Sequence, residues 1–290
     1  MNPSELVLTP SGLPYHTHLG GEHLADDVVL MGDPGRIDMF KHVFERIEYE
    51  TQNREMRVLT GFYHDHRFTA MSTGMGCDNI DIVMTELDVA ANINITTGQP
   101  MPVLRKLNMV RLGTCGAMHG DLACGSYVAS THAIGMDGLL NYYSHDTALF
   151  EPRLAQAFAD HLALDRRFAQ PYAVPAGSAL LDRLASDLPQ GITVTAPGFY
   201  APQGRTIRIV PTLPDLEQRL ASFEWEGLRI NNLEMETSGI YGMAKVMGHE
   251  ALTICLVIAN RAEGTFLSTY QNEMNQLVGR TLELLSIEKR

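Results

Sequence analysis

Two segments of the chain place arginine beside glycine where an apolar run ends, which suits the binding of an oxyanion. They are residues 31–36, with Gly32 and Arg36, and residues 110–116, with Arg111 and Thr114. Glycine lets backbone N–H groups approach a ligand closely, a hydroxyl adds a donor, and guanidinium groups bind phosphate in pairs of hydrogen bonds. Phosphate is the expected ligand, although turns with solvated arginines would show the same pattern. Neither segment matches GxxxxGK[ST] or GxGxxG, so sites for nucleoside triphosphates and dinucleotides lose support.

A pair of glutamates, Glu234 and Glu236, lies where a helix is expected to begin. At a separation of two residues their side chains point in different directions, which disfavours the paired acid and base of a glycosidase. One carboxylate that accepts the two adjacent hydroxyls of a ribose fits the pattern better. The alternative is that both acids only favour the N-terminal end of the helix dipole.

A third polar cluster, Gln203 and Arg205, lies on a loop rich in glycine and proline that begins at Phe199. A carboxamide and a guanidinium at this spacing can present donors and an acceptor to a flat heterocycle. By itself the pattern is weak, because most Gln-x-Arg triplets are surface loop.

The charge of the chain argues against a nucleic-acid partner. The 22 Lys and Arg residues face 34 Asp and Glu residues, which gives a formal net charge of −12, whereas nucleic-acid binding relies on basic surfaces. Only 4 of the 22 cations are Lys, so 22 − 4 leaves 18 Arg. Since Arg suits phosphate and carboxylate, some of these arginines are candidates for an anion site, and ordinary surface solubility is the alternative.

The chain shows no targeting or membrane segment. No basic stretch followed by an apolar run opens it, and no run reaches about 18 uninterrupted apolar residues. The four cysteines form no CxxC pair, which fits a reducing compartment. We therefore expect a cytoplasmic protein without a membrane partner. His64 and His66 could chelate a metal from one strand face, but without a third ligand a solvated turn is the better interpretation, and no metal site is expected.

These chemical groups need a scaffold of alternating strands and helices. Hydrophobic patterning predicts strands at 28–31, 56–62, 68–72, 108–112, 126–134, 192–196 and 251–259, with a tight turn at 113–116. It predicts helices after residue 36, after residue 76 with Asp78 as the N-cap, and at 149–162, 234–247 and 269–287. Such alternation indicates an α/β fold with a largely parallel sheet and ligands at the carboxyl ends of its strands. No linker divides the chain, so we expect a single domain over residues 1–290.

Taken together, the motifs resemble those of the uridine phosphorylases, the pyrimidine branch of the nucleoside phosphorylase superfamily. The resemblance extends from about residue 18 to residue 261. It rests on Gly32-Asp33-Pro34 with Arg36, Arg54-Glu55, residues 72–76, residues 111–116, Phe199-Tyr200 with Gln203-Gly204-Arg205, residues 232–236 and Asn260-Arg261. The family implies a single α/β domain with a mixed, partly barrel-like central sheet flanked by helices.

The resemblance implies a role for individual positions. The implied phosphate site is Gly32, Arg36, Arg111 and Thr114, completed by Arg54 from a neighbouring subunit. The implied ribose contacts are Thr114, Met235 and Glu236, with His18 reaching across a subunit interface. The implied base site is Gly116, Phe199, Gln203, Arg205, Ile258 and Arg261. Arg205, Gln203, Glu236 and Arg111 are the expected catalytic residues.

The implied activity is the reversible phosphorolysis of uridine to uracil and ribose 1-phosphate, as in pyrimidine salvage. Phosphate would be a co-substrate, and no cofactor is expected. Purine phosphorylases of the related branch place an Asp near the end of the strand that corresponds to residues 257–261, and this segment has no carboxylate, which favours uridine. The alternatives are a nucleosidase, a phosphorylase for another nucleoside and a non-catalytic nucleoside-binding protein.

The chain departs from the family pattern in three places. Cys115 stands where many relatives have Thr or Ser, and we expect its buried thiol to be inert. Residues 92–105 are longer than in the hexameric enzymes and are similar to the dimeric relatives, so we expect a homodimer with shared sites, with a hexamer as the alternative. Glu55, Met75 and Asn79 match positions that hold a monovalent cation in some hexameric members, but Asn79 replaces a serine and no cation is expected. The sequence does not rank ribose against deoxyribose.

Overall fold

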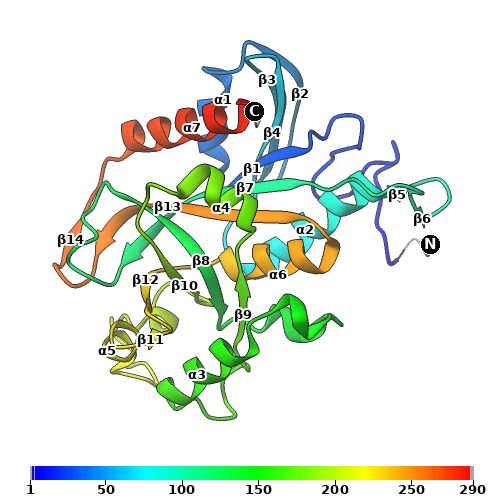
Figure 1. Ribbon diagram of the computed structural model, residues 1–290. Coiled ribbons are helices and arrows are strands. Elements are labelled where there is room, and N and C mark those ends of the chain that lie inside the picture. Colours follow the sequence, from blue (N-terminus) through cyan, green and yellow to red (C-terminus); the bar gives the residue numbers. More distant parts are fainter. Residues whose placement is uncertain (1, 3, 288–290) are drawn as a thin grey trace.

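The first apolar run of the sequence becomes a buried strand in the middle of a long twisted sheet (Figure 1). The computed structural model describes residues 2 and 4–287. The sheet runs in the order β11, β12, β10, β8, β13, β7, β1, β4, β3 and β2. The bounds are β1 Asp27–Met31, β2 Arg46–Asn53, β3 Met56–Tyr63, β4 His66–Ser72, β7 Asn108–Ala117, β8 Tyr127–Gly135, β10 Gln190–Thr195, β11 Glu224–Trp225, β12 Leu228–Glu234 and β13 Glu250–Asn260.

Part of this sheet closes on itself. The strands β7, β13, β8, β10 and β12 are neighbours in that order, and β12 also pairs with β7 through Asn232 and Leu233. These strands form a closed barrel, and β1 to β4 extend it as an open sheet. The mixed, partly barrel-like sheet is thereby confirmed. The expectation of a largely parallel sheet holds for β4, β1, β7 and β13 and for β8, β10 and β12, but β13 and β8 run antiparallel, as do β2, β3 and β4.

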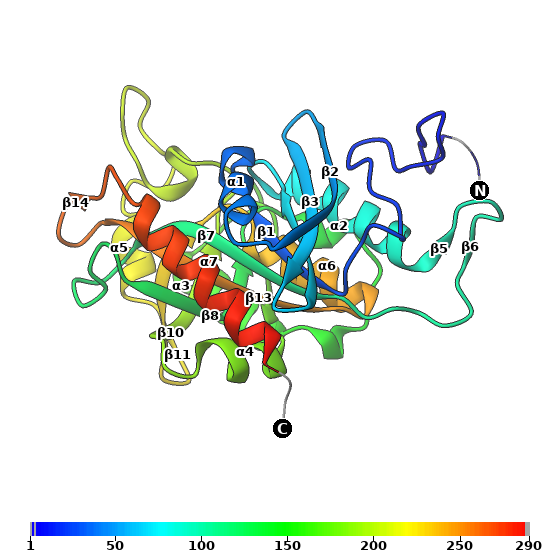
Figure 2. The same cartoon turned by 90° about the horizontal axis from the view of Figure 1, so that it is seen from above.

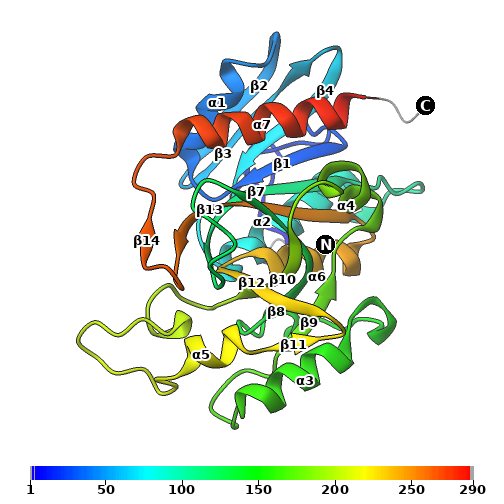
Figure 3. The ribbon, with the colours of Figure 1, turned by 60° about the vertical axis from the view of Figure 1, so that its left-hand side comes forward.

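Helices cover both faces of the sheet (Figures 1 and 3). The bounds are α1 Asp38–Lys41, α2 Cys77–Asn92, α3 Pro152–Leu162, α4 Ser178–Ala185, α5 Leu216–Ala221, α6 Thr237–Met247 and α7 Gln271–Ser286. The long helices α2 and α6 pack together on one face, whereas α4 and α7 lie on the other. The apolar face predicted for the last helix is confirmed, since Met274, Leu277, Val278, Leu282 and Leu285 are all buried. None of the described helices is long and apolar enough to cross a membrane.

Short elements complete the fold around this framework. The strand β9 (Tyr172–Pro175) pairs with β8, and β14 (Thr265–Phe266) folds back on β13. The predicted insertion contains a hairpin of β5 (Ile93–Asn94) and β6 (Gln99–Pro100), which projects from the body of the molecule (Figure 2). Short 3₁₀ helices occupy Pro34–Ile37, Leu139–Tyr142, Thr147–Leu149 and Ala201–Gln203.

Three local predictions are wrong. Residues 113–116 are not a turn, because β7 continues through them with a strand partner, β13, along its length. Glu234 is not the first residue of a helix but the last of β12, and α6 begins at Thr237. Asp78 is not the N-cap of α2, since Gly76 takes that position. Sequence patterning also missed β2, β9, β12, α4 and α5, whose periodicity is short or interrupted.

Candidate active site

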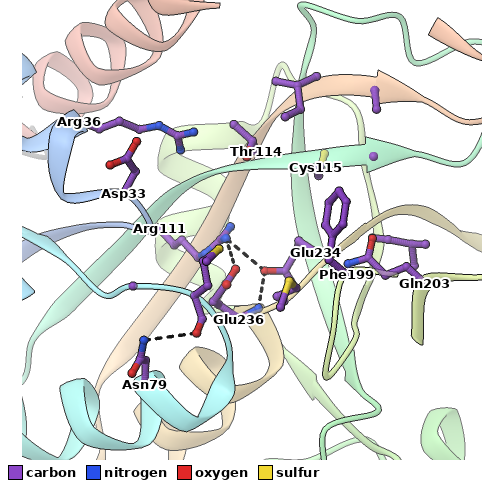
Figure 4. A pocket seen from close by; sticks show the side chains of 18 of the residues that line it. Asp33, Arg36, Asn79, Arg111, Thr114, Cys115, Phe199, Gln203, Glu234 and Glu236 are labelled. Atoms are coloured by element: carbon purple, nitrogen blue, oxygen red, sulfur yellow. Dashed lines mark hydrogen bonds and ion pairs between the residues drawn. The ribbon is translucent and has the colours of Figure 1, made fainter. Parts of the chain in front are cut away.

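A cavity of about 800 Å³ opens where the predicted motifs converge (Figure 4). Its wall is formed by the ends of β1 and β12, the second half of β7, the end of β13, the first turn of α2 and the loop before α5. Among the predicted site residues, Gly32, Arg36, Arg111, Thr114, Gly116, Phe199, Gln203, Arg205, Met235, Glu236 and Ile258 line the cavity. His18, Arg54 and Arg261 are not part of its lining.

The floor of the cavity is a buried cluster of charges centred on Arg111. The Nη2 of Arg111 donates a short hydrogen bond to Oε2 of Glu236 and lies 3.5 Å from Oε2 of Glu234. Burial opposes the charged guanidinium, but the two carboxylates outweigh burial and raise the pKa of Arg111 above its usual value. Arg111 is therefore a permanent cation at the bottom of the cavity.

Glu236 is the acidic partner that faces the ligand space. Its Oε1 accepts the backbone N–H of Gly76 at 2.8 Å, and its Oε2 accepts from Arg111. Burial raises the pKa of Glu236, with Glu234 adding to the rise and Arg111 opposing it. A carboxylate so placed can accept hydroxyl groups of a ligand.

Two further groups join Arg111 at one end of the cavity. Arg36 lies on the 3₁₀ helix after β1 and donates from Nη2 to the hydroxyl of Tyr270 at 2.9 Å. Asp33 fixes this turn by accepting the N–H of Gly35 at 2.8 Å. Thr114 on β7 faces Arg36 across the cavity (Figure 4). Two guanidinium groups and a hydroxyl at one end can bind an oxyanion with two or more charges.

The other end of the cavity carries the predicted readers of a base. Arg205 donates from Nη1 to Oε1 of Gln203 at 2.6 Å and to the carbonyl of Phe199. Its guanidinium carbon lies 3.9 Å from the centre of the Phe199 ring. Burial, with some repulsion from Arg261, lowers the pKa of Arg205 from its usual value. The group nevertheless remains charged, so a flat ligand would meet an aromatic ring, a carboxamide and a cation.

Arg261 lies outside the cavity lining and supports the base loop from behind. Its Nη1 donates to the backbone carbonyl of Gln203 at 2.6 Å, and its Nη2 pairs with Glu217 of α5 at 2.6 Å. The side chain of Arg261 also lies beside Gly116, which does line the cavity. Its contact with a base, implied by the family, remains a prediction.

His18 and Arg54 do not line this chain's cavity; Arg54 is exposed and His18 is half-buried. Both have left-handed backbone conformations, with φ of 51° and 52°. The turns that carry them are joined, because Asn53 donates from Nδ2 to the carbonyl of His16 at 3.1 Å. The carboxylate of the buried Glu86 accepts the N–H of His16 at 3.1 Å and holds this segment in place. Their donation to a neighbouring subunit remains a prediction.

Three further residues line the cavity although the sequence did not indicate that they bind a ligand: Glu234, Phe266 and Cys115. The sequence assigned no separate role to Glu234, which accepts the N–H groups of Glu236 and Thr237 at the start of α6 and also contacts Arg111. Phe266 on β14 lines the cavity only because the chain folds back on β13, which no local pattern reveals. Cys115 lines the cavity too, and burial raises the pKa of its thiol well above the usual value, which favours an inert thiol.

The histidines considered as metal ligands have other partners. Nε2 of His66 lies 2.6 Å from Oδ2 of Asp27, and Nδ1 of His64 lies 3.3 Å from Oε1 of Glu45. Within the part of the chain that the structure describes, no group of three or more His, Cys, Asp or Glu could hold a metal ion.

Gly113 makes the room that the guanidinium of Arg111 occupies. A Cβ atom on Gly113 would lie 1.8 Å from Nη1 of Arg111. We expect Gly113→Ala to displace Arg111 and lower ligand-saturated activity and phosphate affinity by about 10- to 100-fold, the value of a hydrogen bond to a charged group. Gly279→Ala in α7, where no atom beyond the backbone of the same helix and the adjacent residues lies within 4 Å of the new Cβ, is the matched control. Steady-state kinetics check both, and equal activities would contradict the steric argument.

Comparison with known proteins gives the family to which this fold and cavity belong. Residues 26–286 match the Phosphorylase superfamily. The chain belongs to this superfamily, whose members include phosphorylases of both uridine and purine nucleosides.

Uridine phosphorylases and purine nucleoside phosphorylases are about equally similar to this chain in sequence. The chain is 25% identical to the uridine phosphorylase of Thermococcus kodakarensis over 283 residues, which cover 98% of this chain and 90% of that protein. It is 26% identical to a DeoD-type purine nucleoside phosphorylase of Shewanella loihica over 262 residues, or 89% and 92% of the two chains. Overall similarity therefore leaves the base to be inferred from the site.

Solved structures agree on the fold. A nucleoside phosphorylase of Trypanosoma brucei, described as showing uridine phosphorylase activity, matches with a TM-score of 0.84 at 25% identity and covers 97% of this chain and 98% of its own. The purine nucleoside phosphorylase of Toxoplasma gondii matches with a TM-score of 0.64 at 20% identity, over 96% and 98% of the two chains. At that identity the second match concerns the fold alone.

Proposed function

We propose that the protein catalyses the reversible phosphorolysis of uridine to uracil and ribose 1-phosphate. The observation that carries this proposal is the order of groups along one cavity: the arginines Arg36 and Arg111 at one end, Glu236 on the floor, and Gln203 at the other end (Figure 4), where Arg205 is hydrogen-bonded to it. A phosphate, a ribose and a pyrimidine joined in this order would each meet a matching set of groups. The names of the uridine-cleaving relatives support the same activity.

The proposed mechanism needs only positioning and electrostatics. Breaking the bond between ribose and base develops positive charge on the sugar and negative charge on the base. Phosphate held by Arg36 and Arg111 would attack C1′ and stabilise the sugar, while Arg205 and Gln203 would stabilise the leaving uracil anion. Glu236 would hold the 2′- and 3′-hydroxyls. The proposal includes no cofactor, with inorganic phosphate as the second substrate.

The end of β13 favours a pyrimidine over a purine. Asn260 is the last residue of this strand, and its side chain is fully engaged with the protein. Its Nδ2 donates to the carbonyls of His119 and Leu122 at 2.9 and 2.8 Å, and its Oδ1 accepts the N–H of Glu263 at 2.9 Å. This strand end therefore offers no free acid to protonate a purine, which supports uridine as the substrate.

We further propose a cytoplasmic homodimer in which His18 and Arg54 complete the partner's site. Neither residue lines the cavity of its own chain, and the turns that carry them are joined. All four cysteines are free thiols, which suits a reducing compartment. A hexamer would share sites in the same way.

The direct test is to follow base release from uridine with and without phosphate. We expect base release from uridine only with phosphate, and weaker turnover of inosine. Comparison of uridine with deoxyuridine then ranks the two sugars, and comparison of deoxyuridine with thymidine shows the effect of the methyl group on the base. Release without phosphate would instead identify a nucleosidase, and preferential cleavage of inosine a purine phosphorylase. If no nucleoside is cleaved under any condition, the enzymatic proposal is wrong and a binding protein is the better description.

A further inference from the structure

Glu234 supports the start of α6 from the end of a strand. Its Oε2 accepts the backbone N–H groups of Glu236 and Thr237, each at 2.8 Å. Its Oε1 accepts the hydroxyl of Thr195 at 2.5 Å, and its side chain is only 1% exposed. Three protein donors thus hold this carboxylate in one position, which makes it a poor candidate for binding substrate itself.

This support frees the neighbouring carboxylate. Glu236 occupies the N-cap position of α6, but its own side chain makes no capping hydrogen bond. Glu234 accepts the N–H groups of Glu236 and Thr237, and the Oγ1 of Thr195, which itself donates to Glu234, accepts the N–H of Ser238 at 2.9 Å. The side chain of Glu236 therefore points away from α6, toward Gly76 and Arg111. In ordinary helices the N-cap side chain accepts the N–H of the second or third helical residue. Here Thr195, bonded to Glu234, accepts that of Ser238, so the carboxylate of Glu236 remains available to the cavity.

Glu234 also contacts the cation of the site. Its Oε2 lies 3.5 Å from Nη2 of Arg111, the same nitrogen that binds Glu236. The edge of the guanidinium that carries Nη2 is therefore held by protein carboxylates. The other terminal nitrogen, Nη1, donates to Sγ of Cys255 at 3.4 Å, so the carboxylates and this thiol together orient Arg111 in the cavity.

We propose that Glu234 is a positioning residue for the phosphorolysis, which rests on the function proposed above. It fixes the backbone of Glu236 and one edge of Arg111, so that the carboxylate meets the ribose while the cation meets phosphate. Glu234 acts through these two residues and does not touch the substrates.

The charge of Glu234 gives the proposal a distinctive readout. The groups that face Glu236 are Glu234 from β12, Arg111 from β7, and the Gly76 N–H with the Cys77 thiol at the start of α2. Burial raises the pKa of Glu236, Arg111 and the Gly76 N–H lower it, and Glu234 adds to the rise. Removing the charge of Glu234 therefore lowers this pKa, and the acid limb of kcat/KM moves to lower pH.

Two substitutions separate geometry from charge. Glu234→Gln keeps an acceptor for the N–H groups of α6 but removes the charge, so we expect activity within about tenfold of the unmodified enzyme and an acid limb at lower pH. Glu234→Ala removes the acceptor as well, and kcat/KM for the nucleoside should fall by about 10- to 100-fold. The KM for the nucleoside should rise more than the KM for phosphate. Glu224→Gln, an exposed substitution on β11, is the control and should change neither kcat/KM nor the pH of its acid limb.

The outcomes are distinct. If the enzyme cleaves nucleosides but Glu234→Ala equals the control, the positioning role is wrong. An acid limb of Glu234→Gln that coincides with that of the unmodified enzyme would also overturn it, and this measurement decides the matter if the alanine variant fails to fold. Failure of the unmodified enzyme to cleave any nucleoside would instead remove the proposed function.

Discussion

Arg111→Ala is expected to cause the largest loss of both stability and activity. The substitution leaves the buried carboxylates of Glu236 and Glu234 without their cation. Removing one partner of a buried ion pair costs about 3–5 kcal/mol of unfolding free energy. Phosphorolysis should fall by a factor of about 10²–10³, as for loss of one preorganised donor to a reacting anion. Chemical unfolding and steady-state kinetics measure the two effects.

The stability loss should also depend on pH. Without the cation, the folded-state pKa of Glu236 rises further above its unfolded value, so the folded state binds more protons than the unfolded state between the two values. Stability then falls as pH rises through this window, and the variant's deficit is larger at about pH 8 than at about pH 5.

Arg36→Ala provides the matched comparison for Arg111. Arg36 lies at the same end of the cavity but is half-buried, and the described contacts of its guanidinium are with the hydroxyl and ring of Tyr270. This variant should bind phosphate more weakly while its unfolding free energy changes by less than about 1 kcal/mol. Equal stability of the two variants would show that Arg111 does not neutralise the buried carboxylates.

Arg205→Ala is expected to remove uridine turnover while largely sparing phosphate binding. The substitution deprives Oε1 of Gln203 of its donor and removes the cation beside Phe199. If Arg205 stabilises the leaving base, kcat/KM for uridine falls by about 100-fold or more. Phosphate affinity, set at the other end of the cavity, should change by no more than about twofold, because separate sites act independently. Calorimetric titration with phosphate and kinetics with uridine check the two parts.

Arg208→Ala is the control for this experiment, because Arg208 is exposed on the same loop. It should retain uridine turnover and phosphate binding. Equal losses of turnover and phosphate affinity in Arg205→Ala would contradict the assignment of this residue to the base.

The chemical groups of the site could be recognised in the sequence because their identities are local. Arg36, Arg111, Gln203 and Arg205 each lie in a short motif of Gly, Pro and polar residues. The strands β1, β3, β4 and β13 were predicted for a similar reason, since continuous apolar runs bounded by turns carry their own signal. The sequence therefore shows the separate motifs of the site but not that they come together in one cavity.

Other features could not be predicted because they depend on partners far along the chain. Residues 113–116 look like a turn, yet pairing with β13 keeps them extended and brings Gly113 beside the Arg111 guanidinium. Glu234 ends a strand rather than starting a helix because β12 pairs with β10 up to this residue. Arg261 supports the base loop through a contact that spans 58 residues of sequence.

The sequence by itself determined the chemistry available to this protein: guanidinium groups for an anion, a carboxylate for hydroxyls, and a carboxamide with a cation for a flat base. The tertiary structure decided which of these groups act in one place and how each is charged. Closure of the barrel by β12 and β7 brings Glu234 and Glu236 against Arg111, which lies 125 residues before Glu236. Burial then makes their charges depend on one another, because electrostatic interactions strengthen where water is excluded.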